Sequence, residues 1–437
     1  MHRRNRNGQG ATLFFVGFAA GAALMVGVQA WLNSQVDADL RHYREVRDFV
    51  TANFVRGADH DELVNNALKG MVGELDTYSR YYDEVEAREV ERETRGRFVG
   101  IGAVFRGDIS SGQILFPLAG SPAKQAGMQV GDRIVNIDGV PIEGFDRADM
   151  QAALQGELDS VVELDVIGLD GRERDYKIRR KSVIDPNVRH ARIIDAEHGV
   201  GYLAILGFSH ETSVEFSTAF AGLQEQGMRA LIIDLRGNPG GVLSASIEIA
   251  RRFIPEGLIV STEGRGAPSY YRAEADQAWY RDFPLAVLTD QGSASASEVL
   301  AAALQDHRRA VLVGAPTYGK GKVQTIRRYP EQGTIAKVTT SYYYTPSHRN
   351  LQRDPNNGRD YGIAPDLEIP ISRKEREAIA LHSRHYSPPL EFLEELRAWE
   401  VQEGEELLDR HPLDAQLDAA LELLIGAREQ PVTDRDD

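Results

Sequence analysis

The second half of the chain alternates short apolar runs with helical patterns, and this alternation limits the fold more than any other feature. The runs at 230–235 (ALIIDL) and 285–289 (LAVLT) are almost continuously apolar. Strands of this kind are buried on both faces, as in a sheet that helices cover on each side. With 437 residues, 42% of them hydrophobic, the chain is long enough for two or three hydrophobic cores. We therefore predict an α/β multidomain protein with a layered core at residues 183–372.

The N-terminal segment, residues 1–36, has the pattern of an export or anchoring sequence. Three arginines lie among the first six residues, and no charged residue occurs from Ala11 to Leu32. An uncharged run of this length can span a bilayer as a helix, and the basic residues before it predict a cytoplasmic N-terminus. The alternative is a signal peptide cleaved at Val28-Gln29-Ala30. Under either interpretation we expect the rest of the chain in the periplasm, tethered to the inner membrane or secreted.

Two differently patterned regions follow this segment. Residues 37–95 carry apolar residues three and four apart, which predicts a small helical module. Residues 96–182 contain short β-branched runs separated by glycines, which predicts a small β-rich domain with its own core. At the other end of the chain, residues 373–437 show acidic helical patterns.

The β-rich region resembles a PDZ domain. Three features carry the resemblance: Gly100-Ile101-Gly102 before a strand, the segment GSPAKQAGMQVGDRIVNIDG at 120–139, and a helical patch that ends at Leu154. The resemblance implies that the backbone amides of Gly100, Ile101 and Gly102 hold the terminal carboxylate of a peptide that adds to the sheet edge. Phe98, Ile101 and Leu154 would line an apolar groove that prefers apolar C-terminal residues.

The residues best suited to catalysis lie in the segment 289–325. Ser295 stands in the small-residue run GSASAS between a buried strand and a helix, where we expect an exposed hydroxyl with the following amides directed at its target. A serine at this place is equally typical of a helix N-cap. Lys320 favours the catalytic interpretation, because Gly319 and Gly321 let the backbone approach closely and direct the amine into a pocket.

A serine hydroxyl must lose its proton to attack a carbonyl, and a desolvated lysine can accept that proton. Serine with a lysine base is an accepted variant of the catalytic triad. Gln324, four residues after Lys320, would hydrogen-bond the amine and fix its direction.

These residues closely resemble the catalytic set of the carboxyl-terminal processing proteases, in which serine, lysine and glutamine have this order and spacing. The resemblance begins near residue 37 and includes the motifs LVNNALKGMVGELDTYSRYY, IIDLRGNPGG, YYTPSHRNLQ, GIAPDLEI and LDAQLDAAL. It implies Ser295 as nucleophile, Lys320 as base and Gln324 as orienting residue, and it rejects Ser293 because the reactive serine is the second in GSASAS. The implied fold is a crotonase/ClpP-like layered α/β protease core with an inserted β-rich PDZ domain and helical N- and C-terminal pieces.

Acyl transfer also requires two N–H groups directed at the developing oxyanion. Ala296, which follows the nucleophile, supplies one of them. The resemblance places the glycine turn after the 230–235 strand beside the serine, so Gly240 or Gly241 supplies the other. The sequence does not choose between these two glycines.

Composition excludes several other functions. The formal net charge of -16 argues against a nucleic-acid partner, and the lack of cysteine removes thiol catalysis and thiolate metal sites. No histidines stand at metal-binding spacing, so we assign no metal and no cofactor. Asp290, Glu298 and Asp306 are interpreted as hydrophilic helix starts.

The predicted function is an extracytoplasmic serine endopeptidase that recognises the disordered C-termini of protein substrates through its PDZ domain and cleaves through an acyl-enzyme. Control by an adaptor or activator protein and homo-oligomerisation through the terminal helices are further expectations. The main alternative is a membrane-anchored PDZ adaptor, without enzyme activity, on a degenerate protease scaffold. A crotonase-like acyl-CoA enzyme shares the layered architecture, but the inserted PDZ region and the export segment argue against it.

Overall fold

The computed structural model describes residues 38–353, 361–384, 392–403 and 414–429. The chain divides into two compact units, Met1–Asp83 and Glu84–Asp437. The predicted membrane segment, Ala11 to Leu32, lies outside the described residues. Among the residues that are described, the helices are too short or too polar to cross a bilayer.

The first unit is mainly helical. Residues 38–53 form a helix, followed by α2 (His60–Gly73) and the short strand β1 (Arg80–Tyr82). The carboxylate of Asp59 caps α2 by accepting a hydrogen bond from the N–H of Glu62 at 2.9 Å. The apolar spacing predicted helices in this region, and an acidic cap begins one of them.

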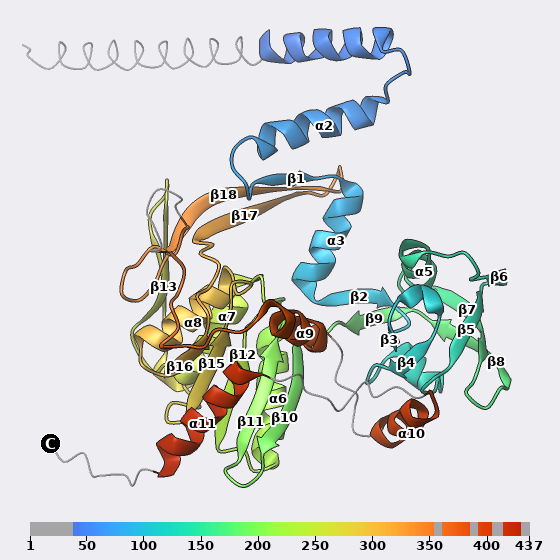
Figure 1. Cartoon of the computed structure of the whole chain (residues 1–437). Helices are drawn as coiled ribbons and strands as arrows, with labels where there is room; N and C mark the ends of the chain where they lie inside the picture. Colours follow the sequence, from blue (N-terminus) through green and yellow to red (C-terminus); the bar gives the residue numbers. More distant parts are fainter. Residues whose placement is uncertain (1–37, 354–360, 385–391, 404–413, 430–437) are drawn as a thin grey trace, which may run out of the picture. The chain divides into compact units, whose positions relative to one another are not determined.

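The core of the second unit is a six-stranded sheet (Figure 1). Its strands in spatial order are β10 (Val188–Asp195), β11 (Val200–Ile205), β12 (Ala230–Asp234), β15 (Leu285–Thr289), β16 (Val311–Gly314) and β19 (Leu367–Glu368). β10 is antiparallel to β11, and the remaining neighbours are parallel. Every residue of β11, β12 and β15 is buried, which confirms the layered α/β prediction.

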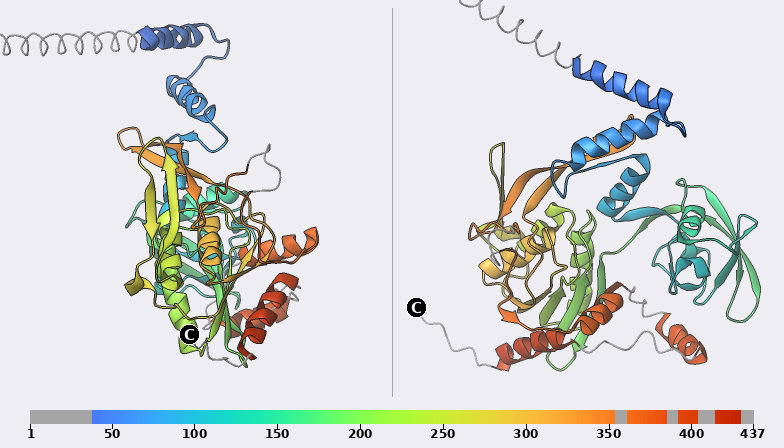
Figure 2. Two further views of the ribbon diagram at one scale, coloured as in Figure 1. Left: turned by 90° about the vertical axis from the view of Figure 1, so that its left-hand side faces the viewer. Right: turned by 45° about the horizontal axis from the view of Figure 1, so that its top comes forward.

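Helices cover both faces of this sheet. They are α6 (Thr212–Glu225), α7 (Leu243–Phe253) and α8 (Ala296–Asp306) on one face and α11 (Ala415–Glu429) on the other. Figures 1 and 2 show α11 against the strands on the side away from α7 and α8. Alternation along β12 directs Leu231 and Ile233 toward α7 and α8, and Ala230 and Ile232 toward α11.

A second, antiparallel sheet borders the candidate site. It contains β13 (Leu258–Gly264), β14 (Ser269–Arg272), β17 (Lys322–Tyr329) and β18 (Thr334–Tyr344). All of β17 pairs with β18, from Lys322 opposite Tyr342 to Tyr329 opposite Thr334, with one irregularity between Val323 and Gln324. This hairpin carries the segment that follows Lys320.

The β-rich region follows α3 (Glu84–Arg95) and contains, besides the short 3-10 helix η1 (Ile109–Ser111), ten strands and α-helices. They are β2 (Arg97–Gly100), β3 (Ala103–Phe105), β4 (Ile114–Pro117), α4 (Pro122–Gln125), β5 (Arg133–Ile137), β6 (Val140–Pro141), α5 (Arg147–Leu154), β7 (Val161–Ile167), β8 (Glu173–Arg179) and β9 (Lys181–Ile184). Its own core contains Ile114, Ile134, Met150 and Leu164, all essentially inaccessible to solvent.

Two further helices follow the core in sequence, α9 (Arg373–Arg384) and α10 (Leu393–Glu403). α10 packs its buried Leu396 and Trp399 against Val104 and Phe116 of the β3–β4 hairpin. The C-terminal helical segment therefore contacts the β-rich region through α10 and the central sheet through α11.

Candidate active site

Ser295 occupies the N-cap position of α8, after the loop that follows β15. Its φ of 57° lies in the left-handed region, which is strained for a residue with a side chain. The phenol of Tyr343 on β18 lies beside Ser295, and this contact opposes the rise that burial causes in the pKa of Tyr343. The prediction of an exposed hydroxyl was wrong, because Ser295 is only 6% exposed and Tyr343 packs beside it.

The two neighbouring serines are held by the turn after β12. The hydroxyl of Ser293 donates to the carbonyl of Leu235 at 2.8 Å, and the hydroxyl of Ser297 donates to the carbonyl of Asn238 at 2.9 Å. Both side chains are fully buried. Ser293 and Ser297 thus hold the start of α8 and the residues before it against the segment that follows β12, whereas Ser295 lies beside Tyr343 of the second sheet.

The glycine turn, residues 237–241, lies directly against Ser295. A Cβ added to Gly240, whose φ is 99°, would lie 2.8 Å from the Cβ of Ser295 and 2.9 Å from the nitrogen of Ala296. The N–H of Gly240 donates to the side-chain oxygen of Asn238 at 2.9 Å. The N–H groups of Ala296 and Gly241, by contrast, have no acceptor within the described residues. The geometry therefore favours Gly241 over Gly240 as a donor to a bound group.

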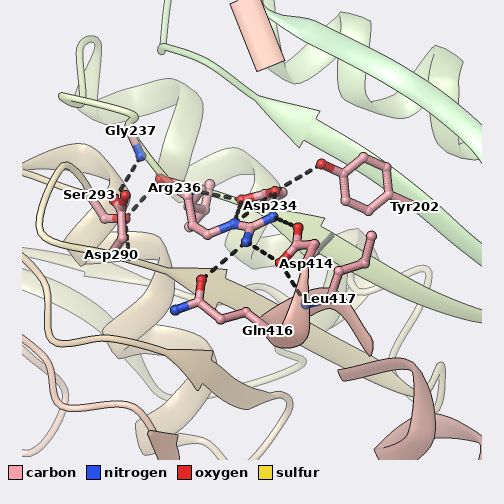
Figure 3. Close-up of polar contacts among 10 residues, drawn as sticks. Tyr202, Asp234, Arg236, Gly237, Asp290, Ser293, Asp414, Gln416 and Leu417 are labelled. Atoms are coloured by element: carbon pink, nitrogen blue, oxygen red, sulfur yellow. Dashed lines mark hydrogen bonds and ion pairs between the residues drawn. The ribbon is translucent and has the colours of Figure 1, made fainter. Parts of the chain in front are cut away.

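Asp290 holds the first residue of the glycine turn in place. Its Oδ1 accepts hydrogen bonds from the N–H of Gly237 at 2.8 Å and from the N–H of Gly292 at 2.9 Å, as Figure 3 shows for Gly237. Asp290 is nearly buried, so its interpretation as a hydrophilic helix start was wrong. Asp306 is the last residue of α8 rather than its first, and it binds the N–H and hydroxyl of Ser347.

Lys320 lies in the loop that leads into β17. Burial lowers the pKa of its amine, the positive charge of Lys337 acts in the same direction, and the carboxylate of Glu298 opposes both. A Cβ added to Gly319 would lie 2.7 Å from the ring of Tyr361, and one added to Gly321 would lie 2.4 Å from the nitrogen of Gln352. The two flanking glycines therefore allow the close approach of chain segments around the lysine.

Glu298 connects the serine to the lysine. Its Oε2 accepts hydrogen bonds from the backbone N–H of Ser295 and from that of Lys320, both at 2.8 Å. Its Oε1 accepts from the hydroxyl of Thr317 at 2.6 Å and from the N–H of Gly319 at 2.7 Å. Burial raises the pKa of this carboxyl group, and the four donors oppose that shift.

The interpretation of Glu298 as a hydrophilic helix start was therefore also wrong, since its side chain is completely buried. A signal for its role exists in the sequence. Ser295 and Glu298 have the spacing of a capping box, in which the third residue of a helix binds the backbone N–H of the cap. The signal does not reveal that the same carboxylate also holds the backbone of Lys320.

Gln324 lies on β17, and its side-chain nitrogen donates to the carbonyl of Lys322 at 3.0 Å. Within the described residues no hydrogen bond joins Gln324 to Lys320. The structure thus brings together Ser295, Ala296, the glycine turn and the backbone of Lys320, and it leaves the side chain of Gln324 on its own strand.

The residues predicted to bind a peptide also lie together. A Cβ added to Gly100 would lie 3.2 Å from the ring of Phe98 and 3.4 Å from the carbonyl oxygen of Leu154. Ile101 is buried, and its carbonyl accepts a hydrogen bond from the N–H of Ala123 at 2.8 Å. Gly102 has a φ of 73°, a conformation that favours glycine.

Arg180, which the sequence did not single out, closes the end of α5 beside this loop. Its guanidinium donates to the carbonyls of Ala153 at 2.6 Å and Leu154 at 3.2 Å, and to the hydroxyl of Ser160 at 3.0 Å. A positive charge at the C-terminus of a helix is favourable. Arg180 therefore holds the last turn of α5 in place next to Gly100.

Comparison with known proteins defines the class. Residues 199–369 match peptidase family S41, and residues 117–168 match the PDZ domain. The chain is therefore a serine protease with a PDZ domain. A PDZ domain and a protease core together fit protein substrates.

Individual relatives define the family. The chain is 33% identical over 375 residues to a carboxy-terminal-processing protease of Bartonella bacilliformis, a match that covers 83% of each chain. It is 36% identical over 318 residues to a carboxyl-terminal-processing protease of Synechocystis sp., covering 71% of this chain and 72% of the relative. A solved photosystem II D1 C-terminal processing protease aligns with a TM-score of 0.41 and 29% identity, covering 72% of this chain and 82% of that chain. The chain belongs to the carboxyl-terminal-processing protease family, as its sequence motifs predicted.

Proposed function

We propose that this protease captures disordered C-termini in its PDZ groove and cleaves them with Ser295 as nucleophile and Lys320 as general base. The observation that carries the proposal is the carboxylate of Glu298, one oxygen of which binds the backbone N–H groups of both residues. That shared oxygen holds the two residues within one site. The lowered pKa of Lys320 makes its neutral amine available nearer to neutral pH than that of an ordinary lysine.

The reaction proceeds by acyl transfer. The hydroxyl of Ser295 turns from Tyr343 toward Lys320, gives its proton to the amine, and attacks the scissile carbonyl. The N–H groups of Ala296 and Gly241 stabilise the oxyanion that forms. Collapse breaks the C–N bond, and the leaving amine takes the proton from Lys320. Water, deprotonated by Lys320, then hydrolyses the ester and releases Ser295.

Gln324 serves this reaction as the residue that orients Lys320. In the structure its amide nitrogen is bonded to Lys322, which leaves its oxygen as an acceptor for a protonated amine. Substrate C-termini bind at Gly100 to Gly102, with Phe98, Ile101 and Leu154 as the apolar lining. The buried hydroxyl of Ser295 is consistent with a site that a substrate or a partner protein must open.

We further propose that the enzyme acts in the periplasm. The uncharged run from Ala11 to Leu32, with arginines before it, supports a tether in the inner membrane, or secretion if the segment is cleaved. An adaptor or activator protein and self-association through the terminal helices belong to the same proposal. Fractionation of cells followed by protease protection tests the location, and a cytoplasmic enzyme would contradict it.

The experiment for the catalytic proposal measures cleavage of casein, with and without candidate partners, by the wild type, Ser295→Ala and Lys320→Ala. Either substitution is expected to lower kcat by at least about 10³-fold, because each removes a member of one catalytic unit. Ser217→Ala on α6 and Lys177→Ala on β8 are matched controls distant in sequence from the site, and both should cleave like the wild type. Undiminished cleavage by Ser295→Ala would overturn the proposal.

A further inference from the structure

Arg236 links the glycine turn to the C-terminal helix. It follows β12 directly, precedes the turn, and is buried. Its guanidinium donates to Asp234 through Nη2 at 2.6 Å and through Nε at 3.0 Å. The same guanidinium also donates to Asp414 Oδ1 at 2.8 Å and to Asp414 Oδ2 at 2.7 Å. Figure 3 shows the arginine between the two carboxylates.

The start of α11 is built around this arginine. Asp414 precedes the helix and accepts a hydrogen bond from the N–H of Leu417 at 3.1 Å, in addition to its two bonds from Arg236. Gln416 accepts a third bond from the guanidinium at 3.1 Å and donates its amide to the carbonyl of Ile369 at 2.8 Å. Asp414 and Gln416 are both buried, although 178 residues separate Arg236 from Asp414 in the sequence.

Charge neutrality alone does not require Asp414. Asp234 already pairs with Arg236, and the hydroxyl of Tyr202 donates to Asp234 at 2.8 Å. A second buried carboxylate therefore adds an excess negative charge, which is unfavourable in a dry interior. Buried ion pairs contribute little net stability, and their best supported role is to fix geometry. Two parallel hydrogen bonds to one carboxylate fix the plane of the arginine.

The orientation of Arg236 is transmitted to the oxyanion site over a short stretch of backbone. The N–H of Arg236 donates to Asp234, and the next N–H, of Gly237, donates to Asp290. The carbonyl of Asn238 then accepts from the hydroxyl of Ser297 and from the N–H of Ala294. Each residue from 236 to 238 is thereby held, and the guanidinium of Arg236 ties this stretch of backbone to the start of α11.

We propose that Asp414 and Gln416 are positioning residues for catalysis, which hold Arg236 so that the glycine turn presents the N–H of Gly241 to the oxyanion. The inference rests on the proposed Ser295 and Lys320 function. α11 is in this account a part of the catalytic apparatus and not only a cover for the sheet. A displacement of a catalytic group by about 1 Å lowers the rate about 10²-fold.

The competing explanation is that α11 acts only by apolar packing. Leu424, in its later turns, is buried in the apolar cluster between α11 and the sheet, and ten residues separate it from Asp414. Leu424→Ala therefore removes packing of α11 and leaves the polar cluster intact. It serves as the control that separates a stabilising role from a positioning role.

The test compares Asp414→Ala, Asp414→Asn, Gln416→Ala and Leu424→Ala in the full chain, with thermal unfolding recorded for each. Cleavage of a disordered peptide substrate is measured well below the lowest unfolding midpoint, in the conditions under which the wild type is active. Asp414→Ala is expected to lower kcat about 10- to 100-fold with KM within about twofold of wild type, because only the transition state is affected. Gln416→Ala should lower kcat less. Asp414→Asn should recover part of the loss, because its amide oxygen still accepts from Arg236.

Leu424→Ala should lower the unfolding midpoint and keep a kcat close to that of the wild type. The inference is overturned if folded Asp414→Ala has the wild-type kcat, or if Leu424→Ala loses kcat to the same extent. If Asp414→Ala does not fold, the kcat values of Asp414→Asn and Gln416→Ala replace it in the test. Wild-type kcat in both of these variants would overturn the inference. Ser295→Ala is measured in parallel: its full activity would contradict the catalytic proposal, whereas its inactivity beside fully active Asp414 variants would contradict this inference alone.

Discussion

The serine side of the site, residues 234–241 and 290–298, is held differently from the lysine side, residues 317–324. On the serine side, Asn238, Ser293 and Ser297 are completely buried, and their side chains bond to the backbone of an adjoining segment. On the lysine side, Lys320 and Gln324 are only partly buried, and Gln324 bonds to its own strand. Under the proposed mechanism, this difference means that the backbone of the oxyanion region is built in advance, while the side chains of Ser295, Lys320 and Gln324 adjust for catalysis.

Replacing Glu298 is expected to have the largest effect, because its carboxylate binds backbone N–H groups on both the serine side and the lysine side. Glu298→Ala leaves four buried donors without their acceptor, each at about 1–3 kcal/mol, so the free energy of unfolding should fall by several kcal/mol. The residual folded enzyme should lose at least about 10²-fold in kcat. Thermal unfolding and casein cleavage are the measurements, with the exposed Glu163→Ala as control. Wild-type activity in Glu298→Ala would show that the two sides are held together by other contacts.

The next largest effect is expected from a methyl group in the glycine turn. Gly240→Ala introduces a Cβ 2.7 Å from the carbonyl oxygen of Ala294 at a φ of 99°, so the turn must move away from Ser295. Strain of this kind costs roughly 1–3 kcal/mol, and displacement of the oxyanion donors should lower kcat about 10²-fold. Gly227→Ala, with a φ of 88° and nothing within 4 Å of the added Cβ, is the matched control. Equal kcat values for the two variants would contradict a preformed serine side.

The smallest effect is expected for a substitution on the lysine side that shifts the pH dependence of kcat. The amine of Lys320 must be neutral to accept a proton, so the rate rises as the pH rises through its pKa. The positive charge of Lys337 lowers that pKa. Lys337→Gln should therefore shift the acidic limb of the pH–kcat profile to higher pH and reduce activity at neutral pH, and Lys177→Gln should shift nothing. A shift to lower pH would contradict the assignment of Lys320 as the titrating base.

Much of the fold was predictable because it depends on local patterns. The apolar runs at 230–235 and 285–289 predicted strands buried on both faces, and the structure places both in the centre of the sheet. The PDZ segment and the family motifs were equally readable. The contacts that organise the site were not, because they join residues far apart in the sequence. Asp414 and Arg236 form such a pair, and Tyr343 beside Ser295 is another.

Polar residues were the main source of error. Asp290 and Glu298 have the composition of exposed helix starts, and nothing local reveals that their carboxylates face backbone N–H groups of other segments. A buried acidic residue is satisfied by tertiary donors, and those donors become visible only when the chain is folded. The choice between Gly240 and Gly241 depends on the conformation of the turn, in which the side-chain oxygen of Asn238 accepts from the N–H of Gly240, and this conformation also becomes visible only when the chain is folded.

The most direct test of the central claim is the identity of the acylated residue. Wild-type enzyme is mixed with a peptide ester, quenched with acid during the first turnover, digested and sequenced by mass spectrometry. We predict a single acyl adduct on Ser295, absent from Ser295→Ala and accumulating no faster than background in Lys320→Ala. An adduct on Ser293 or Ser297, or an undiminished adduct in Lys320→Ala, would contradict the account.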